Sequence, residues 1–199
     1  WQLSAVTEEA DRQVFFSKVF RIYASVMFCG VAGIIMLCQP MMRIFKASYF
    51  EAWTFVPFLT LCSMCTCLNQ FLNSIYVVYK RSTGSLVTML CGAVVNLILN
   101  YLFIQWFGPW GVTPASFISL MLVFILRAYS TRGLLDMDFH PAWLLLNLAL
   151  VLGEIWFMFN VEHWVLPVIV ITAAVCALNL REIFSMLEKL LGRFIKKKA

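Results

Sequence analysis

Residues 82–126 read STGSLVTMLCGAVVNLILNYLFIQWFGPWGVTPASFISLMLVFIL and contain no charged side chain. A helix that crosses a bilayer needs about 20 predominantly apolar residues, so this stretch is too long for one crossing. Gly108-Pro109-Trp110-Gly111, near its middle, is a typical turn signal. The stretch therefore predicts two helices, at about 84–106 and 112–130, joined by a very short hairpin loop.

The composition of the whole chain also indicates a protein that lies in lipid. Of its 199 residues, 62% are hydrophobic and 13% charged, whereas a soluble domain carries roughly 25% charged residues. The formal net charge of +5 does not indicate a nucleic acid partner, because the basic residues lie at the edges of apolar stretches and form no dominant basic face.

Further charge-poor intervals predict four more spanning helices, at about 22–42, 52–79, 141–160 and 163–180. Pro141 begins one of them at a first-turn position, where its missing N–H costs nothing. We therefore expect an all-α fold, a polytopic transmembrane helix bundle of about six helices over residues 22–180. Residues 1–21 are expected to form the cytoplasmic end of a preceding transmembrane helix and its loop.

The distribution of lysine and arginine predicts the orientation of these helices. With six spans, the loops alternate between the two sides of the membrane, and only Arg43 and Lys46 fall on one side, whereas the other thirteen of the fifteen basic residues fall on the opposite side. Positively charged loops are retained in the cytoplasm. The sequence thus predicts a multi-pass protein of the cytoplasmic membrane with both ends of the chain in the cytoplasm.

Residues 181–199 form a basic tail with apolar residues at helical spacing. The charged residues lie between them, and Lys196, Lys197 and Lys198 come near the end. This pattern is typical of an amphipathic helix that lies on the anionic inner leaflet. The alternative is a helix that packs on another part of the protein.

The sequence offers little for enzyme chemistry. Its seven cysteines lie in predicted spans. Cys62, Cys65 and Cys67 could form a metal cluster, but no histidine or carboxylate lies near this apolar run, and buried cysteine usually behaves as a small hydrophobic residue. His140 and His163 flank one predicted helix at its two ends and cannot meet. We expect a protein that is not an enzyme and that binds neither a metal nor a cofactor.

Amide side chains inside the apolar helices are the candidate binding residues. Asn69, Gln70 and Asn73 share one predicted helix, while Asn96 and Asn100 lie four apart on the next and so share a face. An amide in hydrocarbon must find a partner or face water. The two faces could line an aqueous cavity that binds sugar hydroxyls, or they could instead join the helices to one another.

Glu154 is the one carboxylate inside a predicted span. It lies six residues, or ~9 Å at 1.5 Å per residue, from the outer end of its helix. An intramembrane carboxylate indicates a proton or coupling-ion site. At that depth, the side chain could instead reach the outer interface.

Several motifs, taken in order, resemble those of the polysaccharide flippases of the multidrug/oligosaccharidyl-lipid/polysaccharide exporter superfamily. The motifs are residues 57–59 (PFL), 68–76 (LNQFLNSIY), 80–82 (KRS), 92–101 (GAVVNLILNY) and 107–112 (FGPWGV). The resemblance covers about residues 1–135. Thr113-Pro114 departs from it, since an alanine run is common there in the family.

The resemblance implies that this chain is the C-terminal portion of a two-lobed fold of about fourteen helices. It implies translocation of an undecaprenyl-pyrophosphate-linked oligosaccharide by alternating access, with a polysaccharide polymerase as a further partner. Arg21 and Arg127 are then candidate contacts of the pyrophosphate. The alternatives are a cation-coupled multidrug antiporter or a lipid II flippase of the same superfamily, and a non-transporting scaffold of a polysaccharide-assembly complex.

Overall fold

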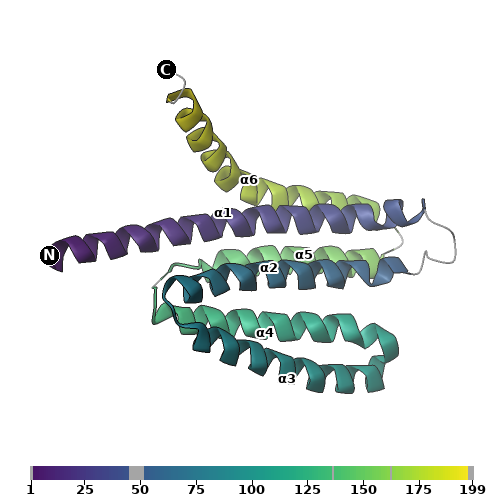
Figure 1. Cartoon of the computed structure of the whole chain (residues 1–199). Helices are drawn as coiled ribbons and strands as arrows, with labels where there is room; N and C mark the ends of the chain where they lie inside the picture. The colour runs from purple at the N-terminus through teal and green to yellow at the C-terminus, as the bar shows by residue number, and fades with distance from the viewer. Residues whose placement is uncertain (1, 45–51, 136, 162, 197–199) are drawn as a thin grey trace. The chain divides into compact units, whose positions relative to one another are not determined.

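The computed structural model describes the backbone of residues 2–44, 52–135, 137–161 and 163–196, and the side chains of residues 11–44, 52–81, 83–135, 137–161 and 163–184. Within these residues, the fold is helical and contains no strand (Figure 1). The elements are α1 (Gln2–Met42), α2 (Val56–Val78), α3 (Ser82–Phe107), the 3-10 helix η2 (Gly108–Gly111), α4 (Val112–Arg132), α5 (Pro141–Asn160) and α6 (Val165–Lys196).

Five helical segments of the described residues are long and apolar enough to cross a membrane, which agrees with the expected all-α membrane protein. They are Asp11–Met42, Ala52–Val78, Thr83–Arg132, Pro141–Asn160 and Val165–Phe184. The third segment has 50 residues and contains both α3 and α4 with η2 between them.

The helices divide between two compact units, which are described separately. The hairpin unit is Cys38–Met137 and contains α2, α3 and α4. The terminal unit joins Trp1–Leu37 to Asp138–Ala199 and contains most of α1 together with α5 and α6.

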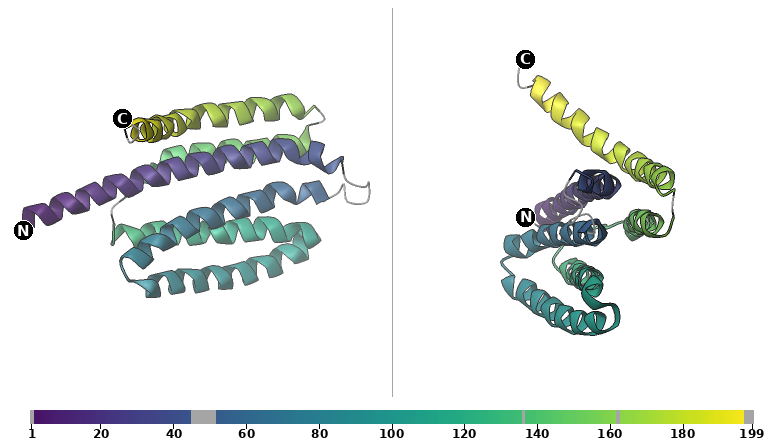
Figure 2. Two further views of the ribbon diagram at one scale, coloured as in Figure 1. Left: turned by 45° about the horizontal axis from the view of Figure 1, so that its top comes forward. Right: turned by 90° about the vertical axis from the view of Figure 1, so that its right-hand side faces the viewer.

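In the hairpin unit, α3 and α4 run side by side, and α2 packs along α4 (Figures 1 and 2). Gly92 of α3 permits the close approach, because a Cβ atom there would overlap a methyl group of Val123 on α4. The buried face of α2 follows the helical repeat of its apolar residues. These residues are Leu61, Met64, Cys65, Leu68, Leu72 and Ile75.

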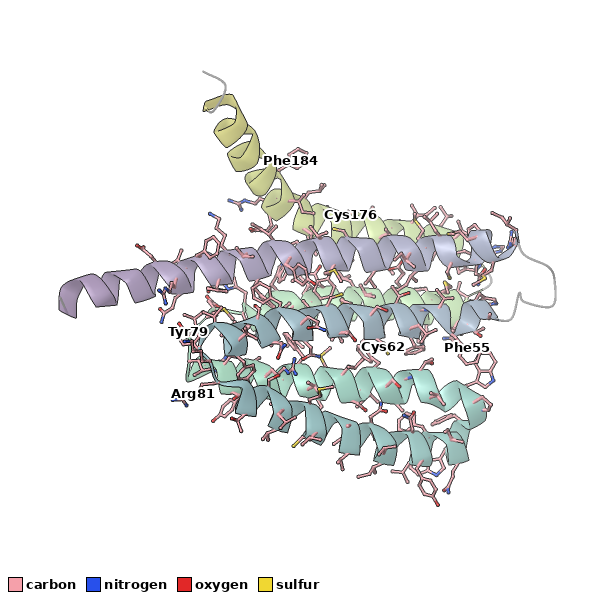
Figure 3. All side chains as sticks on the ribbon, viewed as in Figure 1. Phe55, Cys62, Tyr79, Arg81, Cys176 and Phe184 are labelled. Carbon is pink, nitrogen blue, oxygen red and sulfur yellow. The ribbon has the colours of Figure 1, made fainter. Side chains whose placement is uncertain are left out.

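The hairpin turn η2 requires its two glycines for different reasons. Gly108 has φ of +64°, which favours glycine. A Cβ atom on Gly111 would lie 2.7 Å from the carbonyl carbon of Phe103, so a side chain does not fit there. Phe55, at the start of α2, stacks on Trp110 of the turn with ring centroids 4.5 Å apart (Figure 3).

The connection between α2 and α3 is a Schellman motif. The Arg81 N–H donates to the Tyr76 carbonyl at 2.9 Å, and the Lys80 N–H donates to the Val77 carbonyl at 3.1 Å. Lys80 occupies the left-handed position, with φ of +53°. This tight connection turns the chain within three residues (Figure 3).

In the terminal unit, aromatic pairs join α1 to the start of α5. Phe20 contacts Phe139 edge to face at 5.2 Å, and Phe28 contacts Trp143 in the same way at 6.0 Å. α1 is unbroken from residue 2, whereas the sequence predicted a loop before residue 22. Residues 2–21 contain no proline or glycine that would end a helix.

The last helix, α6, also runs further than its predicted span, because it continues past residue 180 to Lys196. The part that carries Phe184 turns away from the part that carries Cys176 (Figure 3). The backbone of the predicted amphipathic tail is therefore helical as far as Lys196. The side chain of Lys196 and the whole of Lys197 and Lys198 lie outside the described residues.

Candidate functional site

A cavity of about 500 Å³ opens among the three helices of the hairpin unit. Polar side chains from all three helices line it together with small and apolar ones. They are Thr66, Asn69, Gln70, Asn73, Ser85, Met89, Gly92, Ala93, Asn96, Ser116, Ser119, Leu120, Val123 and Arg127. This volume falls within the range of about 300–1,000 Å³ that is usual for small-ligand sites.

The cavity brings together five of the residues that the sequence singles out. Asn69, Gln70 and Asn73 reach it from α2, Asn96 from α3 and Arg127 from α4. The sixth candidate of this unit, Asn100, lies one turn beyond Asn96 and donates a hydrogen bond of 2.9 Å to its side-chain oxygen. Asn100 thus orients a cavity residue without lining the cavity.

Arg127 is the most distinctive residue of this site, because its charged side chain is only 7% exposed. Its Nη1 donates to the backbone carbonyl of Asn69 at 2.8 Å, its Nε to the Thr88 hydroxyl at 3.2 Å and its Nη2 to the Ser85 hydroxyl at 3.4 Å. A guanidinium has five N–H groups. One on Nη1 and one on Nη2 therefore stay available to a ligand.

No carboxylate balances the charge of Arg127 within this part of the chain, since residues 52–135 contain neither aspartate nor glutamate. The other basic residues of that stretch, Lys80, Arg81 and Arg132, are exposed. A buried cation held only by neutral oxygens is costly, and it favours an anion that supplies the missing charge.

The oxygens that hold Arg127 have further partners of their own. The Thr88 hydroxyl can donate to the carbonyls of Gly84 and Ser85 at 3.1 and 3.0 Å. The Ser85 hydroxyl donates to the side-chain oxygen of Asn73. Serine and threonine within an apolar helix can satisfy backbone carbonyls in this way. The hydroxyls of Ser85 and Thr88, which we call the arginine cage, would therefore keep these other hydrogen bonds if Arg127 were replaced.

The cavity amides also join the helices. Asn69 donates to the Leu120 carbonyl of α4 at 3.0 Å, while its own side-chain oxygen is buried and accepts no hydrogen bond from the residues that the structure describes. Asn96 approaches the hydroxyls of Ser116 and Ser119 on α4 at 3.4 and 3.3 Å. Helix joining and cavity lining, the two roles that the sequence left open, are thus compatible for these amides.

No family model, curated protein or solved structure matches this chain. Function is therefore inferred from the geometry and chemistry of its own residues.

Sequence reasoning missed the hydroxyl groups of the site. Ser85 and Thr88 on α3 are three residues apart, and so are Ser116 and Ser119 on α4, so each pair shares a helix face. That spacing was a usable signal. Which helix each face meets could be read only from the fold.

The remaining two candidates lie in the terminal unit, and one of them, Arg21, is already paired. Its Nη2 lies 2.9 Å from a carboxylate oxygen of Glu182 on α6. Its guanidinium carbon is 5.9 Å from the centre of the Trp143 ring. The Glu182 carboxylate thus already balances the charge that would attract a phosphate to Arg21.

Glu154 on α5 is fully buried. Its Oε1 accepts a hydrogen bond of 2.8 Å from the Thr172 hydroxyl of α6, and its Oε2 has no hydrogen-bond partner in the described part of the chain. Asn147 lies seven residues before Glu154 on α5, and Asn179 lies seven residues after Thr172 on α6; Asn179 donates a hydrogen bond of 2.6 Å to the side-chain oxygen of Asn147. Two polar pairs thus join α5 to α6.

Before α5, Asp138 forms a polar turn with the residues around it. Its Oδ1 accepts the backbone N–H of His140 at 2.9 Å, and its own N–H donates to the Ser17 hydroxyl at 3.1 Å. The hydrogen bond from the His140 N–H, and then the His140 side chain, lower the pKa of Asp138. His140 itself has φ of +45° and precedes Pro141, the first residue of α5.

Proposed function

We propose that the chain is the C-terminal portion of a flippase that moves an undecaprenyl-pyrophosphate-linked oligosaccharide across the cytoplasmic membrane by alternating access. The observation that carries this proposal is the Arg127 cavity, in which a buried cation without a counter-charge lies beside amide and hydroxyl groups. These two chemistries match the charged and the sugar parts of such a substrate.

The physical need for such a cavity is the polarity of the substrate head. Sugar hydroxyls and phosphates lose their hydration in hydrocarbon, so they cross unaided very slowly. The planar fork of an arginine suits two phosphate oxygens. Amides such as Gln70 and Asn73 can donate to and accept from hydroxyl groups. We propose that Arg127 binds the pyrophosphate and that the amides contact the first sugar.

The proposal includes six membrane crossings with both ends of the chain in the cytoplasm. α3 and α4 fold back on one another, which supports counting their 50-residue segment as two crossings. Lys80, Arg81 and Arg132 occupy chain positions that this hairpin connectivity brings to one end of the unit. Arg127 lies five residues, or ~7.5 Å, from that end of α4, where the positive-inside rule predicts the cytoplasmic mouth.

Two partners follow from the same proposal. The lysines at 196–198 would contact anionic lipids of the inner leaflet, and a polysaccharide polymerase would receive the translocated unit. We propose no enzymatic step and no metal or cofactor for this chain.

The test is complementation in a bacterial mutant that lacks its own oligosaccharide-unit flippase. The full-length gene should restore surface polysaccharide, and accumulated lipid-linked oligosaccharide should fall to the level of the parent strain. Drug resistance without restored polysaccharide would support the multidrug antiporter instead. Restoration that depends on the presence of the protein but not on Arg127 would favour a scaffold.

A further inference from the structure

The buried pair Glu154 and Thr172 in the terminal unit is chemically unusual. The carboxylate is 0% exposed and the threonine 8% exposed, so neither side chain lies at the surface of the unit. Glu154 Oε1 lies 2.8 Å from Thr172 Oγ1, and Glu154 Oε2 has no partner among the described residues. One hydroxyl group is thus the whole hydrogen-bonding environment of this carboxyl group.

That hydroxyl group can hold the carboxyl group in either protonation state. Thr172 Oγ1 also lies 2.9 Å from the backbone carbonyl oxygen of Val168. A hydroxyl has one hydrogen and two acceptor lone pairs. An ionised Glu154 accepts the hydrogen of the Thr172 hydroxyl. When Thr172 donates to Val168 instead, a protonated Glu154 donates to Thr172 across the same 2.8 Å.

The surrounding charges favour the protonated state. Within the apolar parts of the three helices of this unit, residues 22–37, 141–160 and 165–180, the other titratable side chains are Tyr23, Cys29 and Cys176, and none is a cation. Arg21 of α1 forms an ion pair with Glu182 of α6, which lies ten residues after Thr172 on that helix. A carboxylate that is desolvated without a nearby cation gains stability when it binds a proton.

A metal cation fits these surroundings less well than a proton does. Sodium sites in membrane helices use backbone carbonyls that an unwound helix segment releases. α5 and α6 are both continuous helices at this level, so their carbonyl groups stay within the helical hydrogen-bond ladder. Glu154 and Thr172 alone supply too few oxygen ligands for a sodium ion.

We infer that Glu154 is a proton-binding site and that Thr172 of α6 is the group that responds to its protonation. Uptake of one proton from water converts the Glu154 carboxylate to the neutral acid. The hydrogen of the Thr172 hydroxyl then turns from Glu154 to the Val168 carbonyl. Glu154 and Thr172 belong to the terminal unit and not to the hairpin unit that carries the substrate cavity, and protonation of Glu154 requires no transported molecule.

Infrared difference spectroscopy of the purified full-length protein in lipid nanodiscs tests this site. A pH titration in potassium buffer should show one carbonyl band of a buried, protonated carboxylic acid. E154Q keeps a side chain of nearly the same shape that can still donate to Thr172, and it should lose this band completely. E182Q, which removes the partly exposed carboxylate of the same unit, should retain it.

Two threonine variants test the role of the hydroxyl group. T172V lacks the donor that stabilises the ionised form, so its carboxylic acid band should persist to higher pH than in the wild type, whereas T172S should titrate as the wild type does. A band that survives in E154Q, or a Glu154 that stays ionised at every pH, would overturn the inference. A titration that shifts when sodium replaces potassium would assign the site to a metal cation.

Discussion

Replacement of Arg127 by methionine should separate the stability of the hairpin unit from its function. In the wild type, the hydrogen bonds from Arg127 to the Asn69 carbonyl and the Thr88 hydroxyl measure 2.8 and 3.2 Å. Each contributes about 1.5–3 kcal/mol, and the bond of 3.4 Å to Ser85 adds little. Burial of the guanidinium without a counter-charge costs several kcal/mol.

These two contributions to the free energy of unfolding offset each other. Methionine is unbranched and can fill much of the same space, and the oxygens of the arginine cage keep their other hydrogen bonds. We therefore expect R127M to change the free energy of unfolding by no more than about 2 kcal/mol in either direction.

Transport should respond far more strongly than stability. Two charge-assisted hydrogen bonds from the free N–H groups of Arg127 to a phosphate would contribute ~3–6 kcal/mol. Since 1.4 kcal/mol corresponds to a factor of ten, affinity for the pyrophosphate head should fall by about 10²–10⁴. R127K keeps the positive charge but not the planar fork of N–H groups, so its affinity for the pyrophosphate should lie between those of the wild type and R127M.

The assay combines thermal unfolding of the purified protein with surface polysaccharide in the complemented flippase mutant. R132M removes an exposed arginine from the same helix and serves as the matched control; it should retain both stability and transport. The reasoning is refuted if R127M transports normally. It is refuted equally if R127M loses about 4 kcal/mol of stability or more, because the arginine would then be a structural residue.

Four further substitutions, at three positions, test the turns of the two units. K80G should raise the unfolding temperature, because the left-handed φ at Lys80 costs a residue with a side chain roughly 1–2 kcal/mol, and K80A should bring no such gain. An ordinary Gly→Ala replacement in a helical conformation stabilises a protein by about 0.4–1 kcal/mol, but G111A should destabilise the α3–α4 hairpin, because its methyl group would meet the backbone of Phe103. Denaturation of K80G and G111A measures these changes. The pKa of Asp138 is lowered in the folded protein, so its carboxylate stabilises the fold above the unfolded pKa of about 3.9, and this contribution disappears as the pH falls through the lower folded value. The difference in unfolding temperature between the wild type and D138N should therefore shrink below about pH 4. A difference that stays constant with pH would contradict the hydrogen bond to His140.

Sequence reasoning reached the helical, membrane-embedded character of the chain because both follow from local properties. The break at Gly108–Gly111 depends on glycine and proline, and α5 begins at a proline. The lengths of α1 and α6 were less predictable. The charge content rises in residues 2–21 and after residue 180, but neither stretch contains a proline, and α6 continues through Gly192. Charge marks where a helix leaves the lipid, and a helix need not end at that point.

The site was predictable on the helices whose polar residues are amides, since Asn69 and Asn73, like Asn96 and Asn100, repeat at four residues and so mark one face. The pairing of Asn147 with Asn179 was not foreseen, because neither has a second amide three or four residues away to mark a helix face. Their register depends on how α5 meets α6. A polar residue in a helix thus predicts that a partner exists, whereas only packing identifies it.

The two buried ionisable residues, Arg127 and Glu154, share a feature that ordinary structural residues lack. Each is held by neutral hydrogen-bonding groups within its own unit, and neither forms an ion pair with any of the described residues. Arg21 and Glu182 form the contrasting case, an ion pair in which the two charges balance each other. A fold that needed Arg127 or Glu154 only for packing would be served as well by an apolar side chain of similar volume. Their incomplete surroundings therefore favour a role for ligands that come and go, an anion at Arg127 and a proton at Glu154.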